Sequence, residues 1–181
     1  MFSKIVQEEV FDMGKKIAAL LTDMFEDSEY TKPVVAFKEK GHEVINIGLE
    51  AGKTVKGKKE GTKVTIDKAV GEVAVADFDA LLIPGGYSPD KLRVDEKAVQ
   101  FTADFVKSNK PVFAICHAGQ LLVTAQVLQG RKFTCYKSII QDVKNAGAEF
   151  IDKEVVVDGN LVSSRNPSDI PAFIKESLQK L

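Results

Sequence analysis

The feature that most constrains the fold of this chain is a set of short, uninterrupted apolar runs. They occupy residues 17–21, 79–84 and 112–115. Runs of this length are too short for a core helix and are typical of strands buried on both faces of a sheet. Residues 43–47 and 133–135 are also interpreted as strands.

Segments with helical spacing or helix-end signals lie between these runs. Predicted helices cover a stretch ending near Gly41, then 95–109, 119–128, 140–146 and a last segment capped by Ser168 and running to Leu181. Residues 51–66 predict a small hairpin, and 155–157 with 161–163 predict a second one around Asp158-Gly159-Asn160. Strands alternating with helices predict an α/β fold. The sheet is expected to be doubly wound, mostly parallel and sandwiched between helices, as in flavodoxin-like proteins.

The 181 residues suit one domain, which we place at 13–181, with residues 1–12 as an N-terminal extension. An alternative is that apolar positions within residues 2–10 form a short helix that docks on the body. The net charge of -1 gives no basic excess for nucleic acid, and the cluster Lys56, Lys58 and Lys59 is interpreted as a solvated loop. No apolar run is long enough for a membrane span, and no signal peptide is recognisable, so we expect a cytoplasmic protein.

The two cysteines, Cys116 and Cys135, are too few for a disulfide framework. They show no metal-ligand spacing with the two histidines, so neither a metal nor a cofactor is predicted. Cys135 lies beside Phe133 in a predicted strand and is expected to be part of the core.

In a doubly wound sheet the functional crevice lies at the carboxyl ends of the strands. Three chain tips are expected there: residues 22–29, 85–90 and 116–119. At the third, an apolar strand stops at Cys116 and small residues then open a helix, which is the pattern of a nucleophile elbow. A helix N-terminus beside the sulfur favours the thiolate. The alternative is a buried core cysteine at a strand end.

The other two tips carry weaker signals. Gly85-Gly86 lets backbone N–H groups turn toward an oxyanion, although a plain turn explains the pair as well. No G-x-G-x-x-G fingerprint of dinucleotide binding is present. A carboxyl group from Glu26, Asp27 or Glu29 held against a thiolate would have a raised pKa and stay protonated. The alternative is an acidic first turn of a helix.

Taken together, these segments resemble the ThiJ/PfpI family, within the class I glutamine-amidotransferase-like superfamily. The resemblance spans Lys15 to Leu181 and rests on several motifs in register: FEDSE at 25–29, DALLIPGGYS at 79–88 with Pro89-Asp90, AICHAG at 114–119, NAGA at 145–148 and VVVDGNLVSSRNPSD at 155–169.

The resemblance implies a role for particular residues. Cys116 matches the family nucleophile, Glu29 the carboxyl group facing it, and His117 the histidine beside it. Asp90 falls where PfpI-like peptidases have an acid that reaches a neighbouring subunit's histidine, so a dimer or larger homo-oligomer is implied. Gly86 and His117 would supply oxyanion N–H groups.

The remaining expected pocket residues are Gly85, Ala118, Tyr136 and Arg165, of which the last two would line or brace the pocket. Two departures stand out: Asp90 is shorter than the glutamate common in PfpI-like proteins, and Ala118 replaces a frequent glycine. No histidine follows His117, which excludes a glutamine-amidotransferase triad with a downstream histidine.

The predicted function is a stress-related, cysteine-dependent enzyme that acts on a small reactive carbonyl, as a glyoxalase or deglycase, or on peptide bonds, as an intracellular peptidase. A compact pocket with a protonatable neighbour suits the carbonyl better. The alternative is a redox-sensing or chaperone stress protein in which Cys116 is oxidised and Glu29 stabilises the product. His117 and Arg165 also have plainer alternatives, as a packing residue and a surface arginine.

Overall fold

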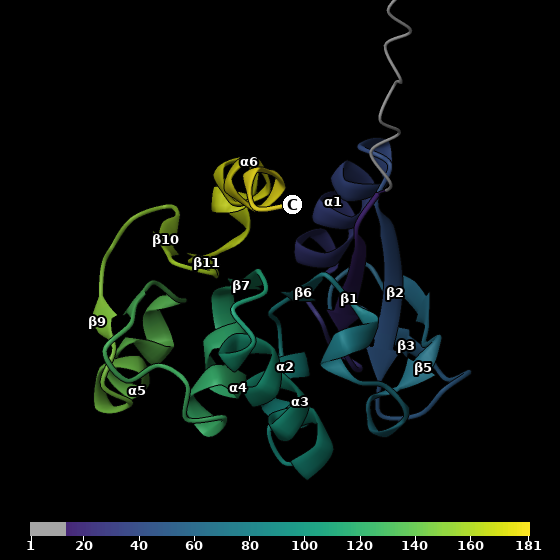
Figure 1. Ribbon diagram of the computed structural model, residues 1–181, viewed down its shortest axis with the longest axis horizontal. Helices are drawn as coiled ribbons and strands as arrows, with labels where there is room; N and C mark the ends of the chain where they lie inside the picture. The colour runs from purple at the N-terminus through teal and green to yellow at the C-terminus, as the bar shows by residue number, and fades with distance from the viewer. Residues whose placement is uncertain (1–13) are drawn as a thin grey trace, which may run out of the picture.

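In a computed structural model, which describes residues 14–181, one seven-stranded sheet forms the centre of the protein (Figure 1). The strand order is β10-β11-β7-β6-β1-β2-β5. Every neighbouring pair is parallel except β10 and β11, so the predicted mostly parallel α/β sheet is confirmed. The strands are β1 (Lys16–Leu20), β2 (Glu43–Gly48), β5 (Lys68–Ala69), β6 (Ala80–Ile83), β7 (Val112–Ile115), β10 (Val156–Asp158) and β11 (Leu161–Ser164).

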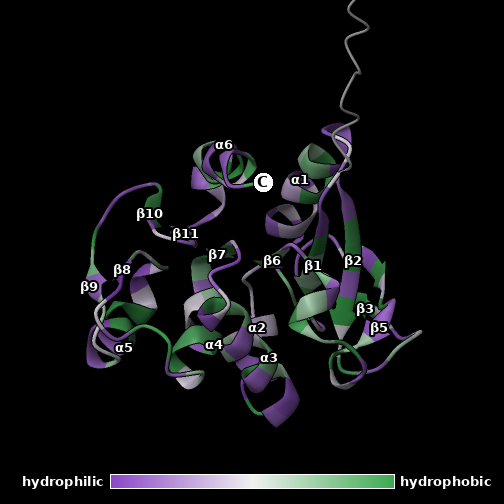
Figure 2. Ribbon diagram, viewed as in Figure 1, coloured by the Kyte–Doolittle hydropathy of each residue, from purple (hydrophilic) through white to green (hydrophobic). Residues whose placement is uncertain are grey.

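Helices cover both faces of this sheet. On one face lie α1 (Asp27–Glu39) and α6 (Ile170–Gln179), and on the other lie α2 (Ser88–Leu92), α3 (Glu96–Lys107), α4 (Gly119–Thr124) and α5 (Ile140–Asn145) (Figure 1). Alternate residues of β1 enter the two cores: Ala18 and Leu20 face α3 and α4, whereas Ile17 and Ala19 face α1 and α6. The outer helices carry both polar and apolar residues, as a helix between core and solvent requires (Figure 2).

Two small sheets complete the described chain. The predicted hairpin within residues 51–66 is present as β3 (Thr54–Lys56) and β4 (Lys63–Thr65). A parallel pair joins β8 (Lys132–Phe133) to β9 (Glu149–Phe150). Short 3-10 turns precede several elements: η1 (Val70–Glu72), η2 (Val75–Asp77), η3 (Cys116–Ala118), η4 (Lys137–Ile139) and η5 (Pro167–Asp169).

Three local predictions are wrong. The helix after Cys116 ends at Thr124, because Gln126 adopts a left-handed φ of 57°. Strand β8 ends at Phe133, so Cys135 lies beyond the strand, although it is buried as expected. Asn166, not Ser168, supplies the cap before the last helix: its side chain accepts a hydrogen bond from the Ser168 N–H, and α6 then begins at Ile170.

The predicted extension at residues 1–12 and the alternative docking helix lie outside the described residues. Within them, no helix is long and apolar enough to cross a membrane.

Candidate active site

Cys116 lies at the carboxyl end of β7, where the strand turns into η3 and α4. Its φ of 62° is left-handed, a conformation that a non-glycine residue adopts only when its surroundings impose it. The residue is 6% exposed. This strained turn at a strand end is the geometry of a nucleophile elbow, as the sequence pattern predicts.

Glu29 approaches the same point from the first turn of α1 and is fully buried. Its Oε1 accepts a hydrogen bond of 2.9 Å from the backbone N–H of Gly85, at the end of β6. A Cβ on Gly85 would lie 2.5 Å from that oxygen and 2.8 Å from the Cys116 Cβ. The glycine is therefore required because three segments converge there with no room for a side chain.

The Glu29 carboxyl group favours its neutral form. Burial, together with the negative charge of Glu26, raises its pKa to about 8, against the opposing hydrogen bonds from Gly85 and Cys116. Its Oε2 has no partner apart from the neighbouring thiol among the described residues. At pH 7 the carboxyl group is therefore mostly protonated, and its otherwise unpaired Oε2 is available to donate a hydrogen bond toward the neighbouring sulfur.

The thiol of Cys116 experiences opposing effects. Burial and the nearby Glu29 raise its pKa, whereas the backbone N–H groups of His117 and Gly86 and the charge of Lys58 lower it. The net direction is upward, contrary to the expectation of a depressed thiol pKa, because desolvation outweighs the donors. Protonation of Glu29 removes the repulsive contribution and leaves a hydrogen-bond donor beside the sulfur.

His117 packs against Tyr136, with ring centroids 4.8 Å apart. Burial lowers its pKa, as does Lys58, while Asp90 raises it, so the imidazole is neutral at pH 7. The Asp90 carboxylate thus acts on the pKa of His117 from within the same chain. Its own carboxylate is exposed and lies 3.9 Å from Arg93.

The Cys116 thiol opens into a cavity of about 330 Å³. The expected residues Gly86, His117 and Tyr136 line it; Gly85 and Ala118 lie behind it, buried. Sequence reasoning missed five further lining residues: Glu26 in its lining role, Lys58, Lys59, Tyr87 and Pro167. Lys58 in particular was assigned to a solvated loop, and no local pattern marks it, because the β3–β4 hairpin reaches the cavity only through tertiary packing.

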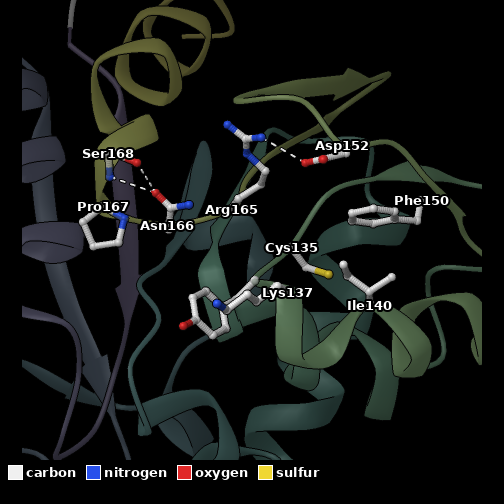
Figure 3. A pocket seen from close by; sticks show the side chains of 10 residues that line it. Cys135, Lys137, Ile140, Phe150, Asp152, Arg165, Asn166, Pro167 and Ser168 are labelled. Atoms are coloured by element: carbon white, nitrogen blue, oxygen red, sulfur yellow. Dashed lines mark hydrogen bonds and ion pairs between the residues drawn. The ribbon is translucent and has the colours of Figure 1, made fainter.

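Arg165 does not line this cavity. It lines an adjoining one of about 570 Å³, which shares Tyr136 and Pro167 with the first (Figure 3). Its guanidinium is bound to Asp169 through Nε at 2.9 Å and Nη2 at 3.0 Å, and to Asp152 through Nη1 at 2.9 Å. The side chain therefore braces the loop after β11. In residues 14–181, no three His, Cys, Asp or Glu side chains cluster as metal ligands would.

The sequence matches the model of the DJ-1/PfpI family over residues 15–180. The chain belongs to the DJ-1/PfpI family. It is similar to Protein/nucleic acid deglycase 2 of Escherichia coli (strain K12), with 63% identity over 93% of this chain and 99% of that protein. General stress protein 18 and Putative cysteine protease YraA, both of Bacillus subtilis (strain 168), are 60% and 56% identical, each over 93% of this chain and 99% of its own length.

The fold agrees with this membership. The crystal structure of Drosophila melanogaster DJ-1beta superposes with a TM-score of 0.84 at 26% identity, covering 93% of this chain and 91% of that one. As a DJ-1/PfpI protein, the chain is a cysteine-dependent enzyme of the stress-related type that its sequence predicts.

Proposed function

We propose that this DJ-1/PfpI protein is a deglycase that acts in the cytoplasm on adducts of reactive carbonyls, with Cys116 as nucleophile. The observation that carries the proposal is the meeting of a strained, buried thiol, a neutral carboxyl group and two backbone N–H donors in one compact cavity. The name of the E. coli relative supports glycated substrates.

In the proposed reaction the Cys116 thiolate adds to the carbonyl carbon of the substrate. The C–S bond forms and the π electrons move to oxygen, where the N–H groups of Gly86 and His117 stabilise the negative charge. Glu29 supplies the proton that this oxygen gains and recovers it when the adduct breaks down. The neutral His117 takes the thiol proton as the C–S bond forms and passes it to the amine or thiol of the adduct, which leaves with the electrons of its bond to the adduct carbon. His117 then takes a proton from water, whose hydroxyl group displaces the Cys116 sulfur, and the sulfur recovers that proton.

Asp90 is proposed to orient His117. Its exposed carboxylate on α2 allows it to do so within one chain or from a neighbouring subunit, and we propose that the working form is a dimer or larger.

A second candidate is peptide hydrolysis, the activity in the name of one Bacillus relative. It is favoured by the 570 Å³ cavity that adjoins the Cys116 cavity across Tyr136 and Pro167, since a peptide needs room on both sides of the reacting bond.

The test is a substrate panel of methylglyoxal-treated thiol and amine adducts and an unstructured protein, assayed with wild type, Cys116→Ala and Cys135→Ala. We expect adduct cleavage by wild type and Cys135→Ala and a loss of at least 1,000-fold, on the order of the effect of removing a nucleophile, in Cys116→Ala. Cleavage of the protein without cleavage of the adducts would instead select the peptidase. Adduct cleavage that survives in Cys116→Ala would reject the proposal.

A further inference from the structure

Lys58, in the turn between β3 and β4, places its ammonium group in the Cys116 cavity. Its side chain is 25% exposed, its Nζ lies 3.0 Å from Oε2 of Glu26, and it lies over the ring of Tyr87 at 5.4 Å from the centroid. Burial lowers and the Glu26 carboxylate raises the pKa of Lys58, and the net shift is upward, so the group stays charged. An ammonium has three donors, and within residues 14–181 Glu26 is the one carboxylate that pairs with Lys58, so N–H groups are left for a ligand.

The turn is fixed by contacts that a solvated loop would lack. The buried Asp27 accepts hydrogen bonds of 3.0 Å from the backbone N–H of Lys59 and from that of Thr62. Burial alone raises the pKa of Asp27, but these donors outweigh it and lower the pKa to about 2. The N–H of Lys58 itself donates to the carbonyl of Phe25 at 2.9 Å.

Gly57 makes the arrangement possible, because a Cβ there would lie 2.0 Å from the Asp27 carboxylate. The position of Lys58 is therefore built into the fold from two segments far apart in sequence. A lysine held in this way is more than a solubilising surface charge.

Among the residues that line the cavity, the positively charged side chains outnumber the negatively charged ones. Lys58 and Lys59 share one carboxylate, Glu26, whose side chain is 6% exposed and lies 3.0 Å and 3.6 Å from the two ammonium groups. Glu29 and His117 are neutral at pH 7. A further negative charge, that of Asp27, lies behind the turn and accepts hydrogen bonds from the backbone N–H groups of Lys59 and Thr62. Lys58 therefore still presents a partly desolvated positive charge to the cavity, where it acts on an anion.

We propose that Lys58 recognises an anionic group of the substrate, so that the preferred reactive carbonyl carries a carboxylate on its electrophilic carbon, as in a 2-oxo acid. Asp27 is the positioning residue that holds the turn. That the substrate is a carbonyl compound rests on the proposed function. The recognition of its anionic group requires only that Cys116 reacts in this cavity.

The test compares two alkylating reagents of nearly the same size, iodoacetate and iodoacetamide. In both reactions the thiolate sulfur attacks the CH₂ carbon, the C–S bond forms and iodide leaves with the C–I electrons. Only iodoacetate carries a carboxylate on the attacked carbon, at the spacing of a 2-oxo acid. The measured quantity is the ratio of the two rate constants at Cys116, taken by peptide mass spectrometry at pH 7.

In Lys58→Met we expect the iodoacetate-to-iodoacetamide ratio to fall about tenfold, which corresponds to the loss of one charge-assisted hydrogen bond. Lys58→Arg should restore most of the ratio. Lys53→Met is the matched control, because Lys53 pairs with the exposed Asp23 at 3.6 Å, outside the cavity, and should leave the ratio unchanged. Asp27→Asn should lower the ratio in the same direction, with thermal melting confirming that the variant is folded.

An equal slowing of both reagents in Lys58→Met would mean that Lys58 only activates the thiol, and would overturn the proposal. So would an unchanged ratio, or a ratio that falls in Lys59→Met but not in Lys58→Met. Because alkylation needs no carbonyl turnover, a failed deglycase assay leaves this test intact, and a failed ratio test leaves the deglycase proposal intact.

Discussion

The carboxyl group of Glu29 and the thiol of Cys116 are buried side by side, so a negative charge on one disfavours a negative charge on the other. The carboxyl group pairs with the Gly85 N–H and keeps its proton near neutrality, whereas the sulfur has the N–H groups of Gly86 and His117. At the scale of the residue, the site therefore stores one proton beside a nucleophile, which suits a reaction that must protonate and deprotonate an oxygen.

The first prediction concerns Glu29→Gln and the pH dependence of stability. The folded-state pKa of Glu29 is raised from 4.5 to about 8, so between these values the folded protein binds a proton that the unfolded chain has lost. This group therefore lowers the free energy of unfolding as pH rises through that window. Glu29→Gln removes the effect, and its Tm relative to wild type should increase from pH 5 to pH 8.

Each kcal/mol moves the Tm of a chain of this size by about 2–4 °C, so thermal melts at several pH values can detect the trend. Glu39→Gln, at the exposed end of the same helix α1, is the control and should give a difference independent of pH. A constant offset between Glu29→Gln and wild type would show that the carboxyl group is ionised in the folded protein.

At the scale of the residue, the sequence predicts which residues form the site better than it predicts the environment that surrounds them. Cys116 and Glu29 belong to motifs that run continuously along the chain, so both could be identified. Lys58 and the upward pKa shift of the thiol could not, because each depends on burial created by segments distant in sequence.

Among the elements, the loop between β11 and α6 shows how a motif that resembles the family can serve structure. Arg165, expected to line or brace the pocket, braces it by joining Asp169, which is buried, to Asp152, which is exposed. The bidentate pairing with Asp169 closes the loop. The contact of Arg165 with Asp152 lies at the adjoining cavity (Figure 3).

The second prediction follows from this pairing. Arg165→Ala leaves the buried Asp169 carboxylate with only the backbone N–H of residue 165, and should lower the free energy of unfolding by about 2 kcal/mol. Lys53→Ala, which removes an exposed ion pair, should cost less than about 1 kcal/mol. Urea denaturation measures both; equal losses in the two variants would show that the Arg165 pairing contributes no more than a surface contact.

The boundaries of helices and strands, like the residues of the site, could be predicted only where the sequence carries a local signal. Strands β1, β6 and β7 were predicted to within a residue or two because each is a run of apolar residues buried on both faces. Helix α2 was missed because its five residues, SPDKL, carry no periodic pattern. The cap at Asn166 was missed because Ser168 is an equally good capping residue by type.

On the scale of the whole molecule, α2 lies next to the site and is flanked by two exposed apolar side chains. Val94 is 84% exposed just after this helix, Tyr87 is exposed just before it, and Asp90 lies between them. Because Asp90 is proposed to orient His117, these two exposed side chains on either side of it make α2 the candidate contact surface in a dimer.

The third prediction is that the protein is a dimer or larger and that α2 contributes to the contact. Val94→Asp should shift the mass measured by light scattering toward the monomer, because it buries a charge in the interface. Val35→Asp, on the exposed face of α1, is the control and should leave the mass unchanged. A wild-type protein that is monomeric and fully active at the same concentration would exclude this assembly from the mechanism.

The central claim, that Cys116 is the reactive thiol, is tested most directly by timed labelling of the two cysteines. Both are buried, and burial raises both thiol pKa values, that of Cys135 to about 12 and that of Cys116 further while Glu29 is charged. At Cys116 the Glu29 charge also opposes the thiolate, but protonation of Glu29 removes that effect and leaves two backbone N–H donors and Lys58, which favour the thiolate. At Cys135 burial and the Asp142 charge both raise the pKa, with no opposing donor among the described residues. Dilute iodoacetamide followed by peptide mass mapping should therefore modify Cys116 at least tenfold faster, about the effect of one such donor. Equal labelling, or faster labelling of Cys135, would contradict the assignment of the nucleophile.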